Sequence, residues 1–177
     1  MPAFDPTRKY AQAHEAFRQG KRQEALVHLA ALLESFPRHA DAWNLAGVIH
    51  NIGRDFESAI LCFRQAIVVG NLPGAMVNLG FAHQKLGQYQ AARDAYRQAV
   101  QHDGSLSIAW QKLGGLGELL GEPMQALDSY RRAAQLDPLD TKSIGDALFL
   151  RRYLADWQPG PEPTPQSLLS ALEDAPR

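Results

Sequence analysis

The chain has 177 residues, 45% of them hydrophobic and 21% charged, a composition that favours one soluble folded unit with a sizeable core. Its 18 Lys and Arg residues are balanced by 19 Asp and Glu residues, which excludes a general electrostatic attraction to nucleic acid or to anionic membranes. The sequence shows neither a secretory signal nor an apolar run long enough to cross a membrane, so we expect a cytoplasmic protein with no membrane partner.

A short motif recurs along the chain at a nearly constant spacing. It reads WNLAG, VNLG and WQKLG, and its last residues are Gly47, Gly80 and Gly114, which lie 33 and 34 positions apart. About twelve residues after each of these glycines, a small residue opens a second apolar run. These small residues are Ala59, Ala92 and Ala126, and Ala25 holds the same place in an earlier copy of the second run. A fixed period of this length predicts repeated structural units.

Each period has room for two helices. Both halves carry apolar residues at i, i+3, i+4 and i+7, which is the helical spacing, and neither half alternates as a strand would. Gly20, Gly53, Gly87 and Gly121 fall between the halves, where a residue that is free to adopt a positive φ can end the first helix. The sequence therefore predicts an all-α chain of helical hairpins.

The small residues also predict how the two helices of a hairpin meet. A side chain larger than a methyl group would push two closely crossing helices apart, so we expect the glycines of the motif to face the alanines of the second run. Aromatic side chains would fill the remaining volume, each contributing about 1.5–3 kcal/mol when buried. The aromatic residues concerned are Trp43, Phe63, Tyr96, Trp110 and Tyr130.

The pattern W-x-x-L-G, followed by Gly, Ala, an aromatic residue, Ala and Pro, resembles the tetratricopeptide repeat (TPR). The resemblance covers most of the chain and implies a right-handed α-solenoid of four helix-turn-helix repeats, at about residues 6–39, 40–72, 73–106 and 107–140. The first repeat departs from the pattern, with Lys9 and Ala13 in place of its Trp and Gly. The second repeat is one residue short and ends in VVGNLPG, so its junction with the third is expected to differ.

The residues after the fourth repeat predict a final helix and then a linker. TKSIGDALFLRRYLADW keeps helical spacing and is interpreted as a capping helix at about 141–156, with Phe149 and Tyr153 helping to close the apolar face of the last repeat. A TPR domain of residues 1–157 would thus precede a Pro-rich linker and a short marginal helix within residues 158–177.

Residues that could carry chemistry do not form a recognisable site in the sequence. GGLGELLG lies inside a predicted helix with no strand before it, which does not favour a nucleotide loop. His50 and His83 occupy equivalent places in two repeats and are expected to be packing residues. Cys62, the single cysteine, lies in the apolar run AILCFRQA and is also expected to be structural. We expect no enzyme activity, no metal and no cofactor.

A binding surface is the remaining possibility. In proteins that this chain resembles, the first helix of each repeat lines a concave groove, and a mixture of amides and apolar groups suits an extended peptide. The groove residues implied by the resemblance are Tyr10, His14, Phe17, Asn44, Val48, Asn51, Val77, Asn78, Phe81, Gln84, Lys85, Gln111, Lys112 and Glu118.

One specialised form of this groove is excluded by the residues present. Members of the family that hold the acidic C-termini of chaperones use a set of Lys, Asn, Asn, Lys and Arg. The matching positions here are Tyr10, His14, Leu45, Gly74 and Asn78, and only one of the five fits that set.

Two functions therefore stay open. The first is a non-catalytic scaffold that binds a protein or peptide segment. The second is the acceptor-recruiting N-terminal part of a larger enzyme, because the run RRYLADW resembles the join between repeats and catalytic domain in bacterial O-linked N-acetylglucosamine transferase-like proteins. The residues that carry this resemblance are Arg151, Arg152, Leu154, Asp156 and Trp157. Self-association through the open ends of the solenoid is compatible with either function.

Overall fold

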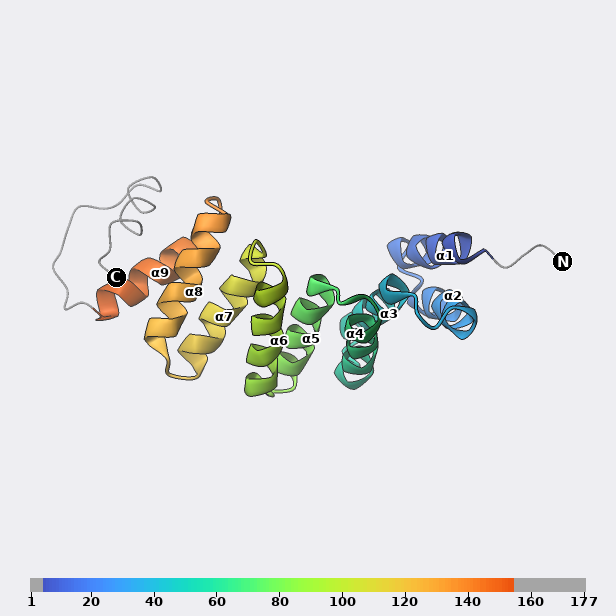
Figure 1. Cartoon of the computed structure of the whole chain (residues 1–177), viewed down its shortest axis with the longest axis horizontal. Helices are drawn as coiled ribbons and strands as arrows, with labels where there is room; N and C mark the ends of the chain where they lie inside the picture. Colours follow the sequence, from blue (N-terminus) through green and yellow to red (C-terminus); the bar gives the residue numbers. More distant parts are fainter. Residues whose placement is uncertain (1–4, 155–177) are drawn as a thin grey trace. The chain divides into compact units, whose positions relative to one another are not determined.

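The computed structural model describes residues 5–154, and these residues form nine α-helices (Figure 1). The helices are α1 (Pro6–Arg18), α2 (Arg22–Ser35), α3 (Ala40–Ile52), α4 (Phe56–Gly70), α5 (Pro73–Lys85), α6 (Tyr89–His102), α7 (Ser107–Leu119), α8 (Pro123–Leu136) and α9 (Thr141–Leu154). The predicted all-α fold of four helix pairs and a final helix is confirmed. The predicted linker at 158–177 lies outside the described residues, as do Asp156 and Trp157.

Local sequence signals set where the helices begin and reverse. Asp5 caps α1, because its carboxylate accepts hydrogen bonds from the backbone amides of Thr7 and Arg8. Three of the four predicted reversals have a glycine at positive φ, as at Gly121 with φ 73°. In the second repeat the prediction for Gly53 is wrong, since Gly53 has φ −72° and the positive φ, 64°, falls on Arg54.

The recurring Trp residues fix the turns that connect successive pairs. Trp43 donates its indole N–H to the carbonyl of Pro37 at 2.9 Å, and Trp110 donates to the carbonyl of Gly104 at 3.0 Å. Met76 holds this place in the third repeat and has no N–H to donate. The preceding turn is built differently, with Asn71 ending α4 in the left-handed region at φ 50°.

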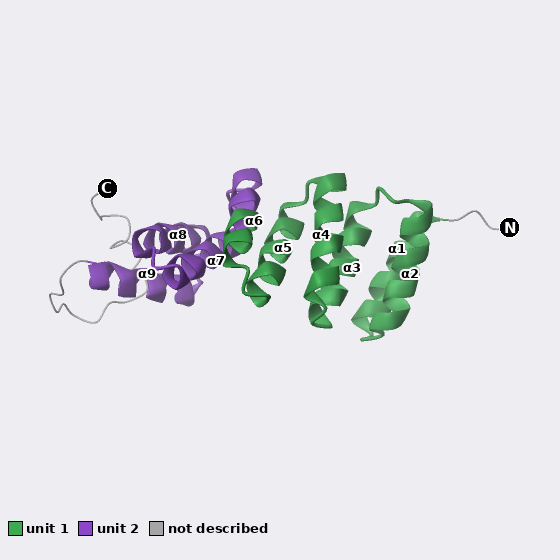
Figure 2. Ribbon diagram, turned by 90° about the horizontal axis from the view of Figure 1, so that it is seen from below, with its two compact units in different colours: residues 1–95 green, residues 96–177 purple. Residues whose placement is uncertain are grey.

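The chain divides into two compact units, residues 1–95 and residues 96–177, with the boundary inside α6 (Figure 2). In the first unit, buried side chains from α1 to α4 form one hydrophobic cluster, and residues of α3 to α6 form another around Phe63 and Leu79. In the second unit, α8 packs on α7 and α9, and Leu127, Tyr130, Ile144 and Leu150 belong to the cluster that joins α8 to α9.

Two glycines of the motif, Gly47 and Gly114, face aromatic rings instead of the predicted alanines. A Cβ atom added to Gly47 would lie 2.5 Å from Cε1 of Phe63, and one added to Gly114 would lie 2.6 Å from Cδ1 of Tyr130. The glycine that meets Ala126 is Gly117, about one helical turn later. The prediction that Gly47 and Gly114 face alanines is therefore wrong, because the missing side chain makes room for a ring on the partner helix.

The final helix covers α8 with a different face from the one predicted. Ile144, Ala147 and Leu150 are buried, and they close the apolar side of the last pair. Phe149 is 64% exposed and Tyr153 is 72% exposed, so the prediction that these two rings close the core is wrong.

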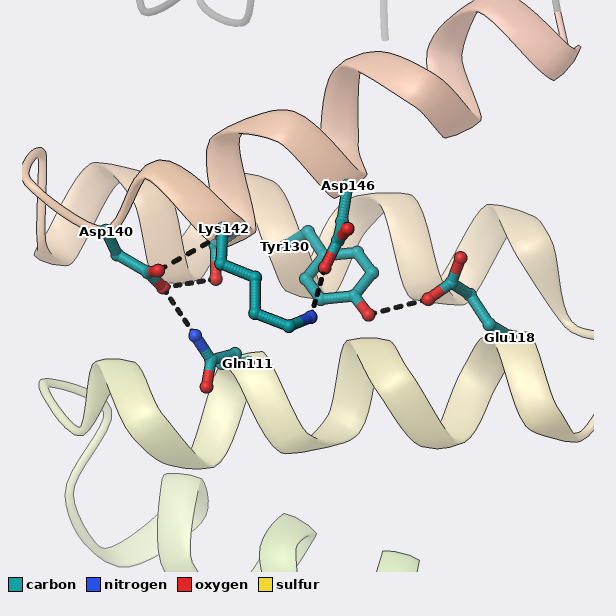
Figure 3. Close-up of polar contacts among 7 residues, drawn as sticks. Gln111, Glu118, Tyr130, Asp140, Lys142 and Asp146 are labelled. Atoms are coloured by element: carbon teal, nitrogen blue, oxygen red, sulfur yellow. Dashed lines mark hydrogen bonds and ion pairs between the residues drawn. The ribbon is translucent and has the colours of Figure 1, made fainter.

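Asp140 holds the start of α9. Its carboxylate accepts hydrogen bonds from the backbone amide and the hydroxyl of Ser143 and, at 2.8 Å, from the side-chain amide of Gln111 on α7 (Figure 3). Burial alone would raise the pKa of Asp140, but the hydrogen bonds from Ser143 and Gln111 hold that pKa below its usual value. This one carboxylate therefore caps α9 and ties it to α7.

We predict that Gly114→Ala lowers the free energy of unfolding by about 1–2 kcal/mol, because the new methyl group overlaps the buried ring of Tyr130. Gly145→Ala on α9 is the matched control. An added Cβ at Gly145 meets nothing within 4 Å, so the change should stabilise the helix by up to about 1 kcal/mol. Urea unfolding followed by circular dichroism measures both. A Gly114→Ala protein as stable as the wild type would contradict the packing described.

We predict that Asp140→Ala lowers the free energy of unfolding by about 1 kcal/mol at neutral pH, because α9 loses its cap. The pKa of Asp140 is lower in the folded than in the unfolded chain. The contribution of Asp140 to the free energy of unfolding is therefore present above about pH 4 and is lost as the pH falls through the pKa of the folded protein. The difference between wild type and variant should shrink on acidification in urea titrations, whereas the control Asp128→Asn on the exposed side of α8 should show no such trend. A difference that does not change with pH would count against this role.

Candidate functional site

The predicted groove residues lie on the first helices of the repeats. In the first unit they come from α1, α3 and α5, and in the second unit from α7. Whether all of them form one binding surface stays a prediction, but the contacts of individual residues separate those with free polar or apolar groups from those committed to the fold.

Two predicted groove residues of the first unit contact each other. Asn78 on α5 donates its side-chain N–H to the side-chain oxygen of Asn44 on α3, at 3.2 Å, and both residues are half-buried. An Asn side chain has two N–H groups and an oxygen with two lone pairs. The single bond between these amides therefore leaves further donors and acceptors on the same face.

Asn51, one helical turn beyond Val48 on α3, carries an unsatisfied acceptor. Its side-chain oxygen is buried and has no hydrogen-bond partner within residues 5–154. A buried acceptor without a partner costs about 1–3 kcal/mol of folding free energy, so its presence calls for a functional or structural reason. Val48 itself packs against the cluster around Phe63 and is largely a core residue.

On the last turns of α5, the cationic side chain of Lys85 lies over the apolar ring of Phe81. The Lys85 ammonium lies 5.0 Å from the centroid of the half-buried Phe81 ring, within the range of a cation–π contact. The long side chain of Lys85 is exposed and can leave the ring when another group arrives. Val77 and Gln84 are half-buried on the same helix.

The predicted residues of α1 are more strongly committed to the fold. The Tyr10 ring stacks on His39, with 5.1 Å between ring centroids, and lies 6.3 Å from the ring of His14. Burial, together with the nearby negative charge of Asp41, raises the pKa of Tyr10. Phe17 packs against the hydrophobic cluster of α1 to α4. These contacts assign a structural role to Tyr10 and Phe17.

In the second unit, two predicted groove residues form hydrogen bonds with other residues of the same unit. Gln111 donates to Asp140, and Glu118 accepts a hydrogen bond of 2.7 Å from the hydroxyl of Tyr130 (Figure 3). Burial raises the pKa of Tyr130, and the carboxylates of Glu118 and Asp146 raise it further. The third predicted residue, Lys112, is half-buried on α7.

The contacts of Asp140 and Asp146 in this network were not predicted from the sequence. The position of Asp140 is nevertheless typical of a helix cap, because it stands just before the helical run and Ser143 follows three positions later. No sequence signal indicates that Asp146 lies beside the ring of Tyr130.

The two equivalent histidines pair within their own repeats. Nδ1 of His50 lies 3.0 Å from a carboxylate oxygen of Asp55, and Nδ1 of His83 lies 2.5 Å from the side-chain oxygen of Gln88. Across the described part of the chain, no three His, Cys, Asp or Glu side chains are grouped as metal ligands would be. Likewise, no helix within residues 5–154 is long and apolar enough to cross a membrane.

An apolar pocket of about 460 Å³ lies between α2, α3 and α4, and its walls include Leu29, Trp43 and Cys62. Two of its lining residues, Leu29 and Ala30, stand where the second repeat has Phe63 and Arg64. Burial raises the pKa of the Cys62 thiol to about 11, which keeps it protonated at neutral pH.

Comparisons with known proteins agree with this repeat architecture. Two family models, both described as tetratricopeptide repeat, match residues 10–75 and 73–106. No curated protein sequence matches the chain.

Several solved structures share the fold. A crystal structure of MamA protein is 17% identical, with a TM-score of 0.76 over 95% of this chain and 86% of that chain. YrrB, described as a TPR protein with an unusual peptide-binding site, is 19% identical, with a TM-score of 0.73 over 96% of this chain and 84% of that chain. The first TPR of Spaghetti (RPAP3), bound to HSP90 peptide SRMEEVD, is 19% identical, with a TM-score of 0.62 over 66% of this chain and 94% of that chain.

The structural similarity at these identities establishes the fold, an all-α TPR solenoid, and not the ligand. TPR domains are typical of protein–protein interaction and are usually non-catalytic. The two family models together span residues 10–106, more than half of the sequence. The chain belongs to the tetratricopeptide repeat family.

Proposed function

We propose that this chain is a non-catalytic interaction scaffold, and that the first-helix face of its first unit binds an extended protein or peptide segment. The observation that carries the proposal is the amide pair of Asn44 and Asn78, which joins α3 to α5 on that face. Two structural neighbours are described as peptide-binding or peptide-bound TPR proteins, which agrees with this proposal.

The polar groups of this face suit the backbone of an extended segment. Such a segment presents N–H and C=O groups at regular intervals, and each of them needs a partner when it leaves water. Asn44 and Asn78 keep unused donors and acceptors after bonding each other, and the buried oxygen of Asn51 needs a donor. A peptide N–H that reached Asn51 would satisfy a group that the free protein leaves unsatisfied.

The apolar part of the face would provide the second element of recognition. Phe81 is half-buried, and the flexible, exposed side chain of Lys85 covers its ring. An apolar side chain of the ligand could replace the Lys85 stem on the ring, while the ammonium moves to solvent or to a ligand carbonyl. The proposed site is therefore Asn44, Asn51, Asn78, Phe81 and Lys85, with the other predicted residues supporting its shape.

We predict that Asn78→Ala together with Phe81→Ala weakens peptide binding at least about tenfold, because a hydrogen-bonding amide and an apolar contact are both lost. The ligand is a peptide selected against the full chain from a displayed random library, and its affinity is measured by fluorescence anisotropy. Gln65→Ala on the exposed side of α4 is the matched control and should bind like wild type. Equal affinity of the double variant for every selected peptide would reject this surface.

We predict that Asn51→Ala weakens binding of the same peptides while leaving the free energy of unfolding unchanged or higher. The substitution removes a buried acceptor that has no partner in the described chain and introduces a better helix former. Thermal unfolding and anisotropy, measured on one preparation, separate the two effects. A destabilised Asn51→Ala protein would mean that the oxygen is satisfied in the folded chain and that it is not kept for a ligand.

A further inference from the structure

The outer face of α9 is the side of the final helix that carries Gly145, Phe149 and Tyr153, which follow one another at i, i+4 and i+8. Both rings are mostly exposed, and they stack on each other with 6.5 Å between their centroids. Beside them Gly145 leaves a gap, because a Cβ atom added there would meet nothing within 4 Å. Two large rings next to such a gap form an apolar surface on which another helix could pack.

Charge differs between the two ends of α9. Carboxylates stand in the turn before the helix and on its second turn, at Asp137, Asp140 and Asp146. Asp146 pairs with Lys142 (Figure 3). The ring end of α9, residues 148–154, carries Arg151 and Arg152 and no acidic residue. The neighbouring α8 adds two arginines and one aspartate, and the carboxylate of Glu118 on α7 already accepts the Tyr130 hydroxyl. The ring end therefore favours an acidic partner.

The sequence that follows α9 contains a segment with matching properties. Residues 155–177 lie outside the described part of the chain, and within them QSLLSALEDA, residues 166–175, has helical spacing. Its leucines stand at i, i+1 and i+4, and Glu173 and Asp174 give it two negative charges and no positive one. A helix of this length is marginal alone in water, so this segment needs an apolar surface on which to pack.

The connection between α9 and this segment is long enough for the segment to return along the helix. Residues 155–165 include four prolines, and eleven residues in the polyproline conformation would span about 34 Å. The 14 residues of α9 extend over about 21 Å. A tether of this length gives the segment an effective concentration on the order of millimolar at α9, so a weak contact is enough to keep it docked.

We propose that the outer face of α9 is the docking surface for residues 166–175 of the same chain. The leucines of the segment would lie on the stacked rings and fill the gap at Gly145, while Glu173 and Asp174 would pair with the arginines of the ring end. This pairing sets the segment parallel to α9. The docked segment closes the outer side of the last repeat, and another protein must displace it to bind there. Peptide binding by the first unit is not required.

Hydrogen exchange of the full chain, measured by mass spectrometry, tests the proposal. Amides of residues 168–175 should exchange at least about tenfold more slowly than those of a free synthetic peptide with the sequence of residues 155–177, because docking stabilises the helix. Phe149→Ala with Tyr153→Ala should remove this protection, although only α9 is changed. Val68→Ala, at an exposed valine of the first unit, is the matched control and should keep it. Circular dichroism verifies that every variant is folded.

Charge variants test the orientation of the segment. Arg151→Gln with Arg152→Gln should lower the protection of residues 168–175 by about threefold, because two opposite charges lose their partners. Lys142→Gln, at the other end of α9, should leave the protection unchanged. Loss of protection with Lys142→Gln and not with the arginine variant would overturn the parallel arrangement.

Exchange as fast as in the free peptide, or protection that survives the loss of both rings, would overturn the proposal. Protection that appears only at raised protein concentration, together with dimers in analytical ultracentrifugation, would overturn it in favour of a second copy of the chain. The Asn78→Ala and Phe81→Ala variant should show the same protection as the wild type, so failure of the first-unit site and failure of this surface are told apart.

Discussion

An aromatic ring that packs on a bare glycine backbone is the contact on which the helix pairs α3–α4 and α7–α8 depend. Gly47 accommodates Phe63 and Gly114 accommodates Tyr130, and both rings are almost fully buried. In the last pair this contact also positions polar groups. Because the ring of Tyr130 lies on Gly114, its hydroxyl reaches Glu118 one turn later on the same helix. Packing in the core thus determines which acidic groups are presented on the surface of the second unit.

The period of the sequence was sufficient to predict the helices and their pairing. Gly and aromatic residues repeat because each unit needs the same close crossing, and the reversals at Gly20, Gly87 and Gly121 need a residue that tolerates positive φ. Facing partners were harder to predict. Spacing along a helix says which residues share a side, but not whether a glycine meets Ala126 or the larger ring four residues later. The positive φ at Arg54 was not predicted, because the adjacent Gly53 is the residue type that usually adopts it.

The candidate site could be predicted only in part, because a polar side chain on the groove face can either stay available to a ligand or form a hydrogen bond within the protein. The repeat alignment brought Asn44 and Asn78 to one face, where they do contact each other. The same alignment selected Gln111 and Glu118, which bind Asp140 and Tyr130 within the second unit. Such hydrogen bonds depend on distances between helices that are far apart in the sequence. These distances cannot be derived from a single sequence. A buried polar atom without a hydrogen-bond partner, such as the side-chain oxygen of Asn51, can be recognised only from the positions of all its neighbours.

A pocket lies between the helices of the first and second repeats, and the chain's single thiol lines it. Cys62 is therefore protected twice, by its burial and by a pKa of about 11, so folded molecules should resist alkylation and disulfide-linked pairing between chains. Because the thiol lines this pocket, local separation of α2 from α3 and α4 would make it more accessible to a labelling reagent. A change in the rate at which Cys62 reacts would thus report a change in the packing of the first repeat against the second.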